Sequence, residues 1–255
     1  GPVHKVTVGE GAPAVLVHCS LSHHRGLLPL AKALGGQATL FDMPGHGRSP
    51  AWNGEGDYQA AVVAAIADCC AGPVDLIGHS FGGTAALRFA TQQPGMVKTL
   101  TLIEPVYFAA AKGTPAYADL AQAMVPFIAA MKANDPLTAT QVFNGLWGGG
   151  PWDSLPTRIQ DYMTDRIALI VAGAKAIEDD PTSVTSAATL GQLDVPVTLI
   201  RGAQSHPVVA AIHAALSARL PNAKDHLIEN AGHMVPITHP EDVAAIIRAA
   251  GPETA

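Results

Sequence analysis

The residues best suited to covalent chemistry lie in the segment Gly78-His79-Ser80-Phe81-Gly82. Glycines two residues before and two residues after Ser80 permit a sharp turn, from which the serine hydroxyl projects toward a substrate. An apolar run precedes this segment, and a helix-like run over Thr84–Gln92 follows it. The N-terminal amides of such a helix favour negative charge beside the serine. We therefore predict that Ser80 is a nucleophile.

A serine hydroxyl needs a base to take its proton, and histidine is the usual base because its pKa lies near neutral pH. Of the eleven histidines, His233 stands apart because Ala231-Gly232-His233-Met234 directly follows the last predicted strand. Loops at the carboxyl ends of parallel strands open on the same edge of a sheet. We predict that His233 is the base for Ser80; the alternative is a histidine on a surface loop.

The elements that must position these two residues follow from the hydrophobic pattern. The predicted strands, which are short and mostly apolar, are Lys5–Val8, Ala14–Cys19, Ala38–Phe41, Val74–Gly78, Thr99–Glu104, Val197–Arg201 and Asp225–Ile228. The predicted helices between them are Leu27–Leu34, Tyr58–Cys70, Thr84–Gln92, Val208–Leu220 and Pro240–Ala249. This alternation predicts an α/β fold with a doubly wound, mostly parallel sheet.

The alternation stops between about Val106 and Leu190, where no strand is predicted. This stretch instead shows the helix patterns Tyr117–Lys132, Pro136–Phe143 and Thr157–Ala176. An all-helical insertion between two strands is most simply a cap over the carboxyl edge of the sheet. We predict a core formed by residues 1–106 and 191–255 and a helical cap formed by residues 107–190.

Four motifs resemble the α/β-hydrolase family, and together they extend over essentially the whole chain. They are Val17-His18, Asp42–Ser49, Gly78–Gly83 and Ala231-Gly232-His233. The order of a serine first and a histidine last also matches this architecture. The resemblance implies that Asp42, His46 and Arg48 form a structural turn and are not catalysts. A helical cap after the sixth strand of the fold, here Thr99–Glu104, is typical of the family as well.

An attack by Ser80 on a carbonyl requires two backbone amides aimed at the developing oxyanion. The resemblance implies that one amide belongs to Phe81 and that the other lies in the loop after Ala14–Cys19. Ser20 is the predicted second donor. The family usually has His-Gly in this loop, whereas this chain has His18-Cys19. A catalytic thiol at Cys19 is disfavoured because it lacks a partner comparable to His233.

The carboxylate that should orient the histidine is missing from its usual place. In the family it lies three or four residues past the glycine that ends the penultimate strand, but here Gly202 is followed by Ala203-Gln204-Ser205-His206. The segment Ser205-His206-Pro207 instead resembles a helix start with Ser205 as its cap.

Glu104 is the predicted substitute because it ends its strand at the active edge of the sheet. Some α/β-hydrolases, haloalkane dehalogenases among them, place the acid after this strand. The alternatives are that Glu104 only anchors the cap, with the acid at Glu229, or that the histidine works in a dyad assisted by water or Ser205.

The resemblance implies a serine hydrolase that cleaves a small or medium carboxylic ester through an acyl-enzyme intermediate. The same serine and histidine would serve a lactonase, an amidase or a carbon–carbon bond hydrolase, and a ligand-binding receptor on a hydrolase fold is a further alternative. We expect an apolar substrate pocket with aromatic and methionine side chains. Its predicted members are Tyr107, Phe108, Phe143, Trp147, Trp152 and Met234.

Composition argues against several other classes. The net charge of −6 is spread over 255 residues without runs, which disfavours nucleic acid or an anionic membrane as a partner. Apolar segments such as Ala60–Ala67 are too short to span a bilayer, and no signal-peptide pattern opens the chain. Three cysteines, two of them adjacent, favour a reducing cytoplasm. The motifs of zinc and nucleotide sites are absent, so no metal or cofactor is expected.

Overall fold

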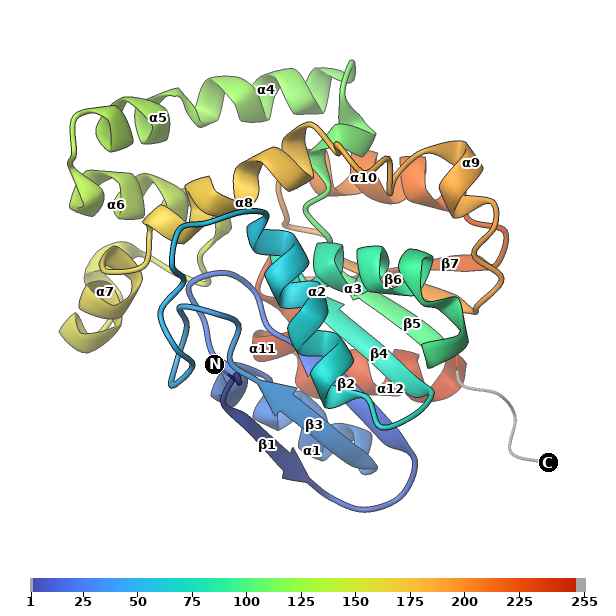
Figure 1. The fold of residues 1–255 in the computed structure, drawn as a ribbon. Helices are drawn as coiled ribbons and strands as arrows, with labels where there is room; N and C mark the ends of the chain where they lie inside the picture. Colours follow the sequence, from blue (N-terminus) through green and yellow to red (C-terminus); the bar gives the residue numbers. More distant parts are fainter. Residues whose placement is uncertain (1, 251–255) are drawn as a thin grey trace.

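The computed structural model describes residues 2–250, which form a seven-stranded sheet with helices on both faces (Figure 1). The strand order is β1-β3-β2-β4-β5-β6-β7, and all neighbouring strands are parallel except β1 and β3. The strands are β1 (Lys5–Val8), β2 (Pro13–Val17), β3 (Gln37–Phe41), β4 (Val74–His79), β5 (Val97–Ile103), β6 (Val197–Gly202) and β7 (Ala223–Ile228). The predicted α/β fold is therefore confirmed, and each predicted strand matches an observed one to within two residues at either end.

The sheet separates two apolar cores because neighbouring side chains of a strand point to opposite faces. In β2, Val15 and Val17 belong to one core and Leu16 to the other. In β4, Leu76 and Ile77 divide in the same way. Burial on both faces explains why these strands are mostly apolar.

Helices α1 (Leu28–Leu34) and α12 (Pro240–Ala250) cover one face of the sheet. Helices α2 (Tyr58–Cys69), α3 (Phe81–Gln92) and α10 (Pro207–Ser217) cover the other. Short turns of helix adjoin them at η1 (His24–Leu27), η2 (Pro94–Met96) and α11 (Val235–Thr238). Each predicted core helix is present, although α3 begins three residues earlier than its apolar pattern suggested because Phe81-Gly82-Gly83 form its first turn.

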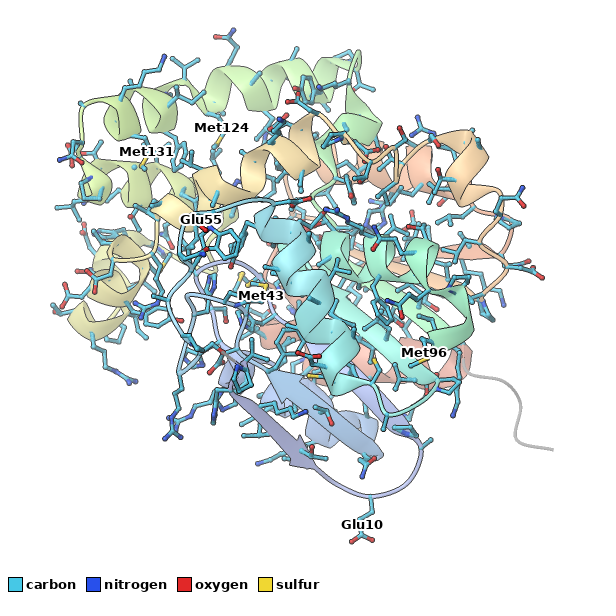
Figure 2. All side chains as sticks on the ribbon, viewed as in Figure 1. Glu10, Met43, Glu55, Met96, Met124 and Met131 are labelled. Atoms are coloured by element: carbon cyan, nitrogen blue, oxygen red, sulfur yellow. The ribbon has the colours of Figure 1, made fainter. Side chains whose placement is uncertain are left out.

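Between β5 and β6, the described chain forms helices and no strand. They are η3 (Phe108–Ala111), α4 (Pro115–Ala123), α5 (Val125–Lys132), α6 (Pro136–Trp147), η4 (Trp152–Ser154), α7 (Thr157–Thr164), α8 (Ala168–Glu178) and α9 (Ala187–Leu190). Met124 and Met131 lie in the helical layer that α4, α5 and α8 build (Figure 2).

Two of the helices predicted in this segment are broken in the structure. The predicted helix Tyr117–Lys132 is divided at Met124 into α4 and α5, because Pro126 has no amide proton to continue the first helix. The predicted helix Thr157–Ala176 is divided between Thr164 and Ala168, where neither proline nor glycine occurs.

The division into a core and a cap stays a prediction. Helix α10 of the predicted core packs against η3 and α4 of the predicted cap, so contacts join the two parts. Residue 1 and residues 251–255, which the prediction assigned to the core, lie outside the described residues.

Candidate active site

Ser80 occupies a strained turn between β4 and α3. Its backbone has φ 55° and ψ −119°, which a non-glycine residue adopts only under constraint. A Cβ atom at Gly78 would lie 2.5 Å from the carbonyl oxygen of Gly82, and a Cβ atom at Gly82 would lie 2.4 Å from the carbonyl oxygen of His18. The two glycines are therefore required by close backbone packing, as the sequence suggested.

The turn brings Ser80 to His233 and Glu104 in one chain of hydrogen bonds. The Oγ atom of Ser80 lies 2.9 Å from Nε2 of His233, and Nδ1 of His233 lies 2.7 Å from Oε2 of Glu104. A proton on Nδ1 satisfies both contacts, since Nδ1 then donates to the carboxylate and Nε2 accepts from the serine hydroxyl. All three side chains are buried.

Glu104 is held by three donors. Oε2 accepts from His233, while Oε1 accepts from the Gly202 amide at 2.7 Å and from the Ser205 hydroxyl. Burial by itself would raise the pKa of Glu104, but these hydrogen bonds lower it below the ordinary value. Its φ of 50° is a second strained backbone angle beside the nucleophile. The structure thus keeps a carboxylate in contact with His233.

The other possible partners of His233 lie elsewhere. Glu229 is exposed just after the end of β7, and within residues 2–250 it makes no hydrogen bond to His233. Ser205 contacts Glu104 and not the histidine. The prediction that Ser205 caps the following helix was wrong: His206 is the cap of α10, and its Nδ1 accepts from the Val208 amide at 3.2 Å. The hydroxyl of Ser205 is engaged by the buried carboxylate instead.

The loop that carries His233 is fixed by His79, whose part sequence reasoning missed. Nε2 of His79 donates to the His233 carbonyl oxygen at 2.8 Å. Burial lowers the pKa of His79 to about 3, so its ring is neutral at pH 7. Its place directly before Ser80 was the available signal. On its other side, the ring of His233 meets the Trp147 ring edge-to-face, with centroids 4.8 Å apart.

The loop after β2 places Ser20 in the wall of the same cavity as Phe81. Both residues line one cavity with Ser80, and within residues 2–250 neither amide has a hydrogen-bond acceptor. Unpaired amides at such a place are suited to bind an oxyanion. Cys19 is also in this loop, but burial raises the pKa of its thiol to about 12, so it stays protonated and a poor nucleophile.

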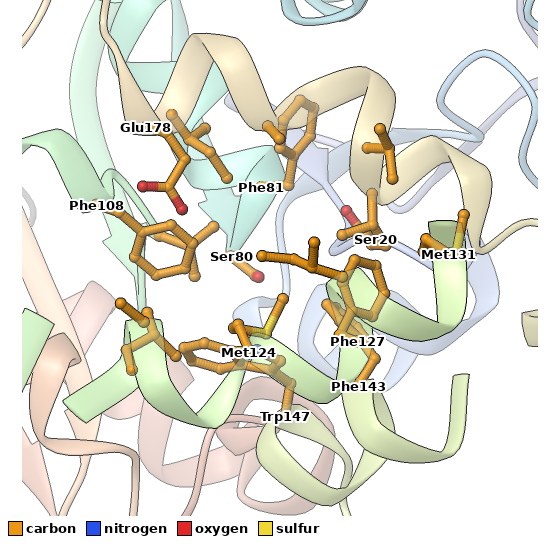
Figure 3. A pocket seen from close by; sticks show the side chains of 18 of the residues that line it. Ser20, Ser80, Phe81, Phe108, Met124, Phe127, Met131, Phe143, Trp147 and Glu178 are labelled. Carbon is orange, nitrogen blue, oxygen red and sulfur yellow. The ribbon is translucent and has the colours of Figure 1, made fainter. Parts of the chain in front are cut away.

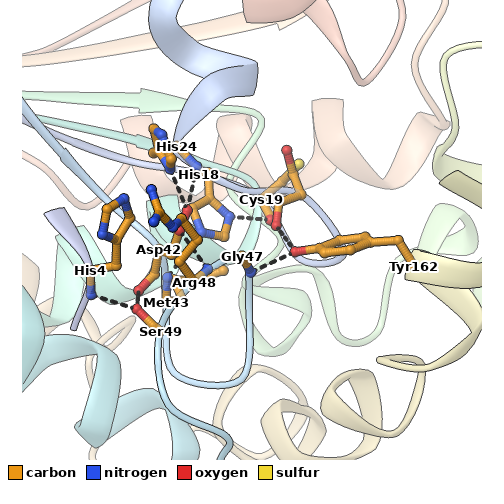
Figure 4. A network of polar contacts seen from close by, with 11 residues as sticks. His4, His18, Cys19, His24, Asp42, Met43, Gly47, Arg48, Ser49 and Tyr162 are labelled. Carbon is orange, nitrogen blue, oxygen red and sulfur yellow. Dashed lines mark hydrogen bonds and ion pairs between the residues drawn. The ribbon is translucent and has the colours of Figure 1, made fainter. Parts of the chain in front are cut away.

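Two buried histidines, His18 (Figure 4) and His46, hold this loop although cysteine replaces the usual glycine. Nε2 of His18 accepts from the Met43 amide, and Nε2 of His46 accepts from the Leu21 amide, each at 3.0 Å. Burial lowers the pKa of His18 to about 4 and that of His46 to about 3, so both rings are neutral acceptors at pH 7. His46 therefore has a structural position.

Asp42 connects the loop after β2 with the loop after β3. Its Oδ1 accepts from the amide and the ring of His24, and its Oδ2 accepts from the Arg48 amide (Figure 4). The side chains of His4, His24 and Asp42 carry potential metal-ligating atoms that lie within 4.8 Å of one another. Oδ1 of Asp42 already accepts two hydrogen bonds and Oδ2 accepts one, so this carboxylate has partners without a metal ion.

A cavity of about 760 Å³ opens on Ser80 (Figure 3). Of the predicted pocket residues, Phe108, Phe143 and Trp147 line it. Tyr107, Trp152 and Met234 do not, which corrects half of that prediction. The additional lining residues include Tyr117, Leu120, Met124, Phe127, Met131, Ile170 and Glu178.

The three residues that miss the cavity have other surroundings. Tyr107 is fully buried and its hydroxyl donates to Gln59. Trp152 lines a separate, smaller cavity beside the glycine-rich turn, and Met234 lies against Gly149. Aromatic composition indicates an apolar interior but does not say which cavity a side chain faces.

None of the helices in residues 2–250 combines the length and the apolar character needed to cross a bilayer.

Comparison with known proteins gives a consistent result. The model of the alpha/beta hydrolase family matches residues 14–246. The lipase LipV of Mycobacterium tuberculosis is 28% identical, over 97% of this chain and 93% of its own. A pimeloyl-[acyl-carrier protein] methyl ester esterase of Aromatoleum aromaticum is also 28% identical, over 80% of this chain and 83% of its own. The solved structure of an esterase from Exiguobacterium antarcticum matches the fold with a TM-score of 0.78 at 17% identity, over 97% and 94% of the two chains.

Proposed function

The chain belongs to the alpha/beta hydrolase family, and we propose that it is a serine hydrolase that cleaves a small or medium carboxylic ester through an acyl-enzyme. That it is an esterase- or lipase-like enzyme follows from its relatives. The observation that carries the finer proposal is the buried chain from Ser80 through His233 to Glu104 at the floor of an apolar cavity.

Acylation begins when Nε2 of His233 takes the hydroxyl proton of Ser80 as its Oγ atom attacks the ester carbonyl. Glu104 keeps the imidazole in the required tautomer and stabilises the imidazolium that forms. The amides of Phe81 and Ser20 hold the developing oxyanion. The imidazolium then gives its proton to the leaving alcohol, and a water molecule activated by the same nitrogen releases the acyl group.

The cavity supports an apolar substrate of limited size. Its volume of about 760 Å³ lies within the range of pockets that enclose small organic ligands. Phe127, Met131, Phe143 and Ile170 give it an apolar wall. Such a wall stabilises each buried methylene group by about 0.8 kcal/mol, so kcat/KM should rise with acyl length until the cavity is full.

A fluorophosphonate probe and graded p-nitrophenyl esters test this proposal. We expect rapid labelling of Ser80 that is lost in Ser80→Ala and reduced in His233→Ala, and an optimum of kcat/KM at an intermediate acyl length. Lactones, amides and a diketone are assayed in parallel. A folded protein that neither reacts with the probe nor cleaves any ester would disprove the proposal, and faster turnover of one of the other classes would reassign the substrate.

A further inference from the structure

The cavity has one feature that hydrolysis of an apolar ester does not use, which is a carboxylate in its wall. Glu178 lies near the end of α8 and lines the cavity together with Tyr117 of α4. The Tyr117 hydroxyl donates to Oε2 of Glu178 at 3.0 Å. Within residues 2–250, Oε1 of Glu178 has no hydrogen-bond partner and no cation within salt-bridge distance. One carboxylate oxygen is thus free for a ligand.

Aromatic rings lie beside this carboxylate. Figure 3 shows the Glu178 side chain directed toward Phe108. The ring of Phe108 lies 5.8 Å from that of Trp147, and Tyr117 lines the same cavity. Aromatic rings attract cations through their negative faces. A carboxylate with rings around it is therefore suited to a positively charged group.

The basic side chains nearby do not occupy this place. Lys132 is the only lysine or arginine that lines the cavity among the described residues, and it follows Met131, which lies on the opposite side of Ser80 from Glu178 (Figure 3). The ammonium group of Lys112, which directly follows η3, lies near Glu178 but is paired with Asp179 at 3.4 Å. Burial raises the pKa of Glu178, which indicates that its carboxylate is partly withdrawn from water.

The position of His233 indicates that the part of the cavity lined by Glu178, Phe108 and Tyr117 receives the leaving group. His233 must protonate the departing alcohol, and its ring packs against Trp147, which in turn packs against Phe108. Ser20, whose amide is the proposed oxyanion donor, lies with Phe127 and Met131 on the other side of Ser80 (Figure 3). The apolar part of the cavity on that side is therefore suited to hold the acyl chain.

We infer that Glu178, with Phe108 and Tyr117, is a specificity site for a cationic group on the alcohol portion of the ester. This inference rests on the proposed esterase function and names the substrate class within it: an apolar acyl chain joined to an ammonium-bearing alcohol. Hydrolysis proceeds as described above, and Glu178 takes no part in bond making or breaking.

The test compares two esters of the same shape. Butyrylcholine carries a trimethylammonium group, and 3,3-dimethylbutyl butyrate replaces that nitrogen with carbon. Hydrolysis is followed by pH-stat titration of the butyric acid that both esters release. The ratio of the two kcat/KM values is measured within each variant, so differences in the folded fraction cancel.

We expect the native protein to favour the choline ester about tenfold, as a partly exposed charge contact combined with a cation–π contact allows. In Glu178→Gln the ratio should fall to about threefold, mainly through KM for the choline ester, because the cation–π contact with the rings remains. The matched control is Asp119→Asn, which removes a negative charge from an exposed residue of α4 that does not line the cavity and, within residues 2–250, forms no salt bridge; it should leave the ratio unchanged.

Three results would overturn the inference. Equal turnover of the two esters by the native protein would show that no cation site exists. An equal fall of the ratio in Asp119→Asn would assign the preference to the general negative potential of this region. Hydrolysis of neither ester, with Ser80 unlabelled by the fluorophosphonate, would reject the esterase proposal and this inference together, whereas hydrolysis of both at equal rates would reject the inference alone.

Discussion

Replacing Glu104 with glutamine exchanges one carboxylate oxygen for an amide NH₂ group. The hydrogen-bond partners of Glu104 determine which of the two oxygens is exchanged. The Gly202 amide and the Ser205 hydroxyl both donate to Oε1. An amide nitrogen at that position would face the Gly202 N–H, donor against donor. The glutamine must therefore keep its oxygen there and place its NH₂ at the position of Oε2, which lies 2.7 Å from Nδ1 of His233.

This arrangement selects the wrong form of the base. The NH₂ group donates to Nδ1 of His233, which favours the tautomer with its proton on Nε2. That proton then points at the Oγ atom of Ser80, 2.9 Å away, where the lone pair is needed. Loss of the correct tautomer lowers kcat by up to about 10⁴-fold, or about 5.4 kcal/mol of transition-state stabilisation.

The assay is steady-state hydrolysis of p-nitrophenyl butyrate, with circular dichroism and thermal unfolding to verify the fold. Glu229→Gln is the matched control, because it makes the same exchange at an exposed residue after β7, and it should retain native turnover. A folded Glu104→Gln protein whose kcat is within tenfold of the native value would refute the argument. Loss of activity in Glu229→Gln instead would move the acid to that residue.

Three further predictions concern the same surroundings. Ser205→Ala removes a donor to Glu104 and so raises the pKa of that carboxyl. The ionisation of Glu104 should then cease to stabilise the fold at a higher pH, and the fall of Tm on acidification should begin at a higher pH than in the native protein. An unchanged dependence of Tm on pH would limit Ser205 to packing. Folding lowers the pKa of Glu104 from 4.5, so its ionisation stabilises the fold above about pH 4.5, and this contribution is lost as the pH falls through the lower folded pKa. The difference in Tm between the native protein and Glu104→Gln should therefore shrink on acidification below pH 4.5. Gly82→Ala should prevent folding or lower Tm severely. Gly145→Ala lies inside α6 and has no atom within 4 Å of the added Cβ, so it should raise the free energy of unfolding by up to about 1 kcal/mol. Equal Tm values for the two variants would contradict the close packing at Gly82.

The elements of the sheet were accessible from the sequence because their signals are local. A parallel strand buried on both faces is mostly apolar, and this rule located the inner strands β2, β4, β5 and β6. The glycines around Ser80 and the place of His233 after the last strand are equally local features. The helical segment was less predictable, since Pro126 interrupts a continuous apolar pattern between α4 and α5.

The position of Glu104 could be predicted only as one of several possibilities. Its place at the end of β5 indicated the right edge of the sheet, but the pattern did not show whether the side chain would reach His233. The choice depends on contacts with residues far along the chain: Gly202 is 98 residues from Glu104, and His233 is 129 residues from it. No periodicity over a single element carries that information.

The sequence by itself determined the succession of strands and helices along the chain, the strained turn at Ser80 and the loop that bears His233. Each of these features follows from the backbone preferences and burial of neighbouring residues. Only the tertiary structure decided which side chains meet. It directs Ser205 to Glu104 and not to a helix cap, and it places Glu178 in the cavity wall while turning Tyr107 away. These outcomes depend on how the crossovers pack the elements together, and a hydrogen bond between distant residues leaves no mark in the local pattern of either.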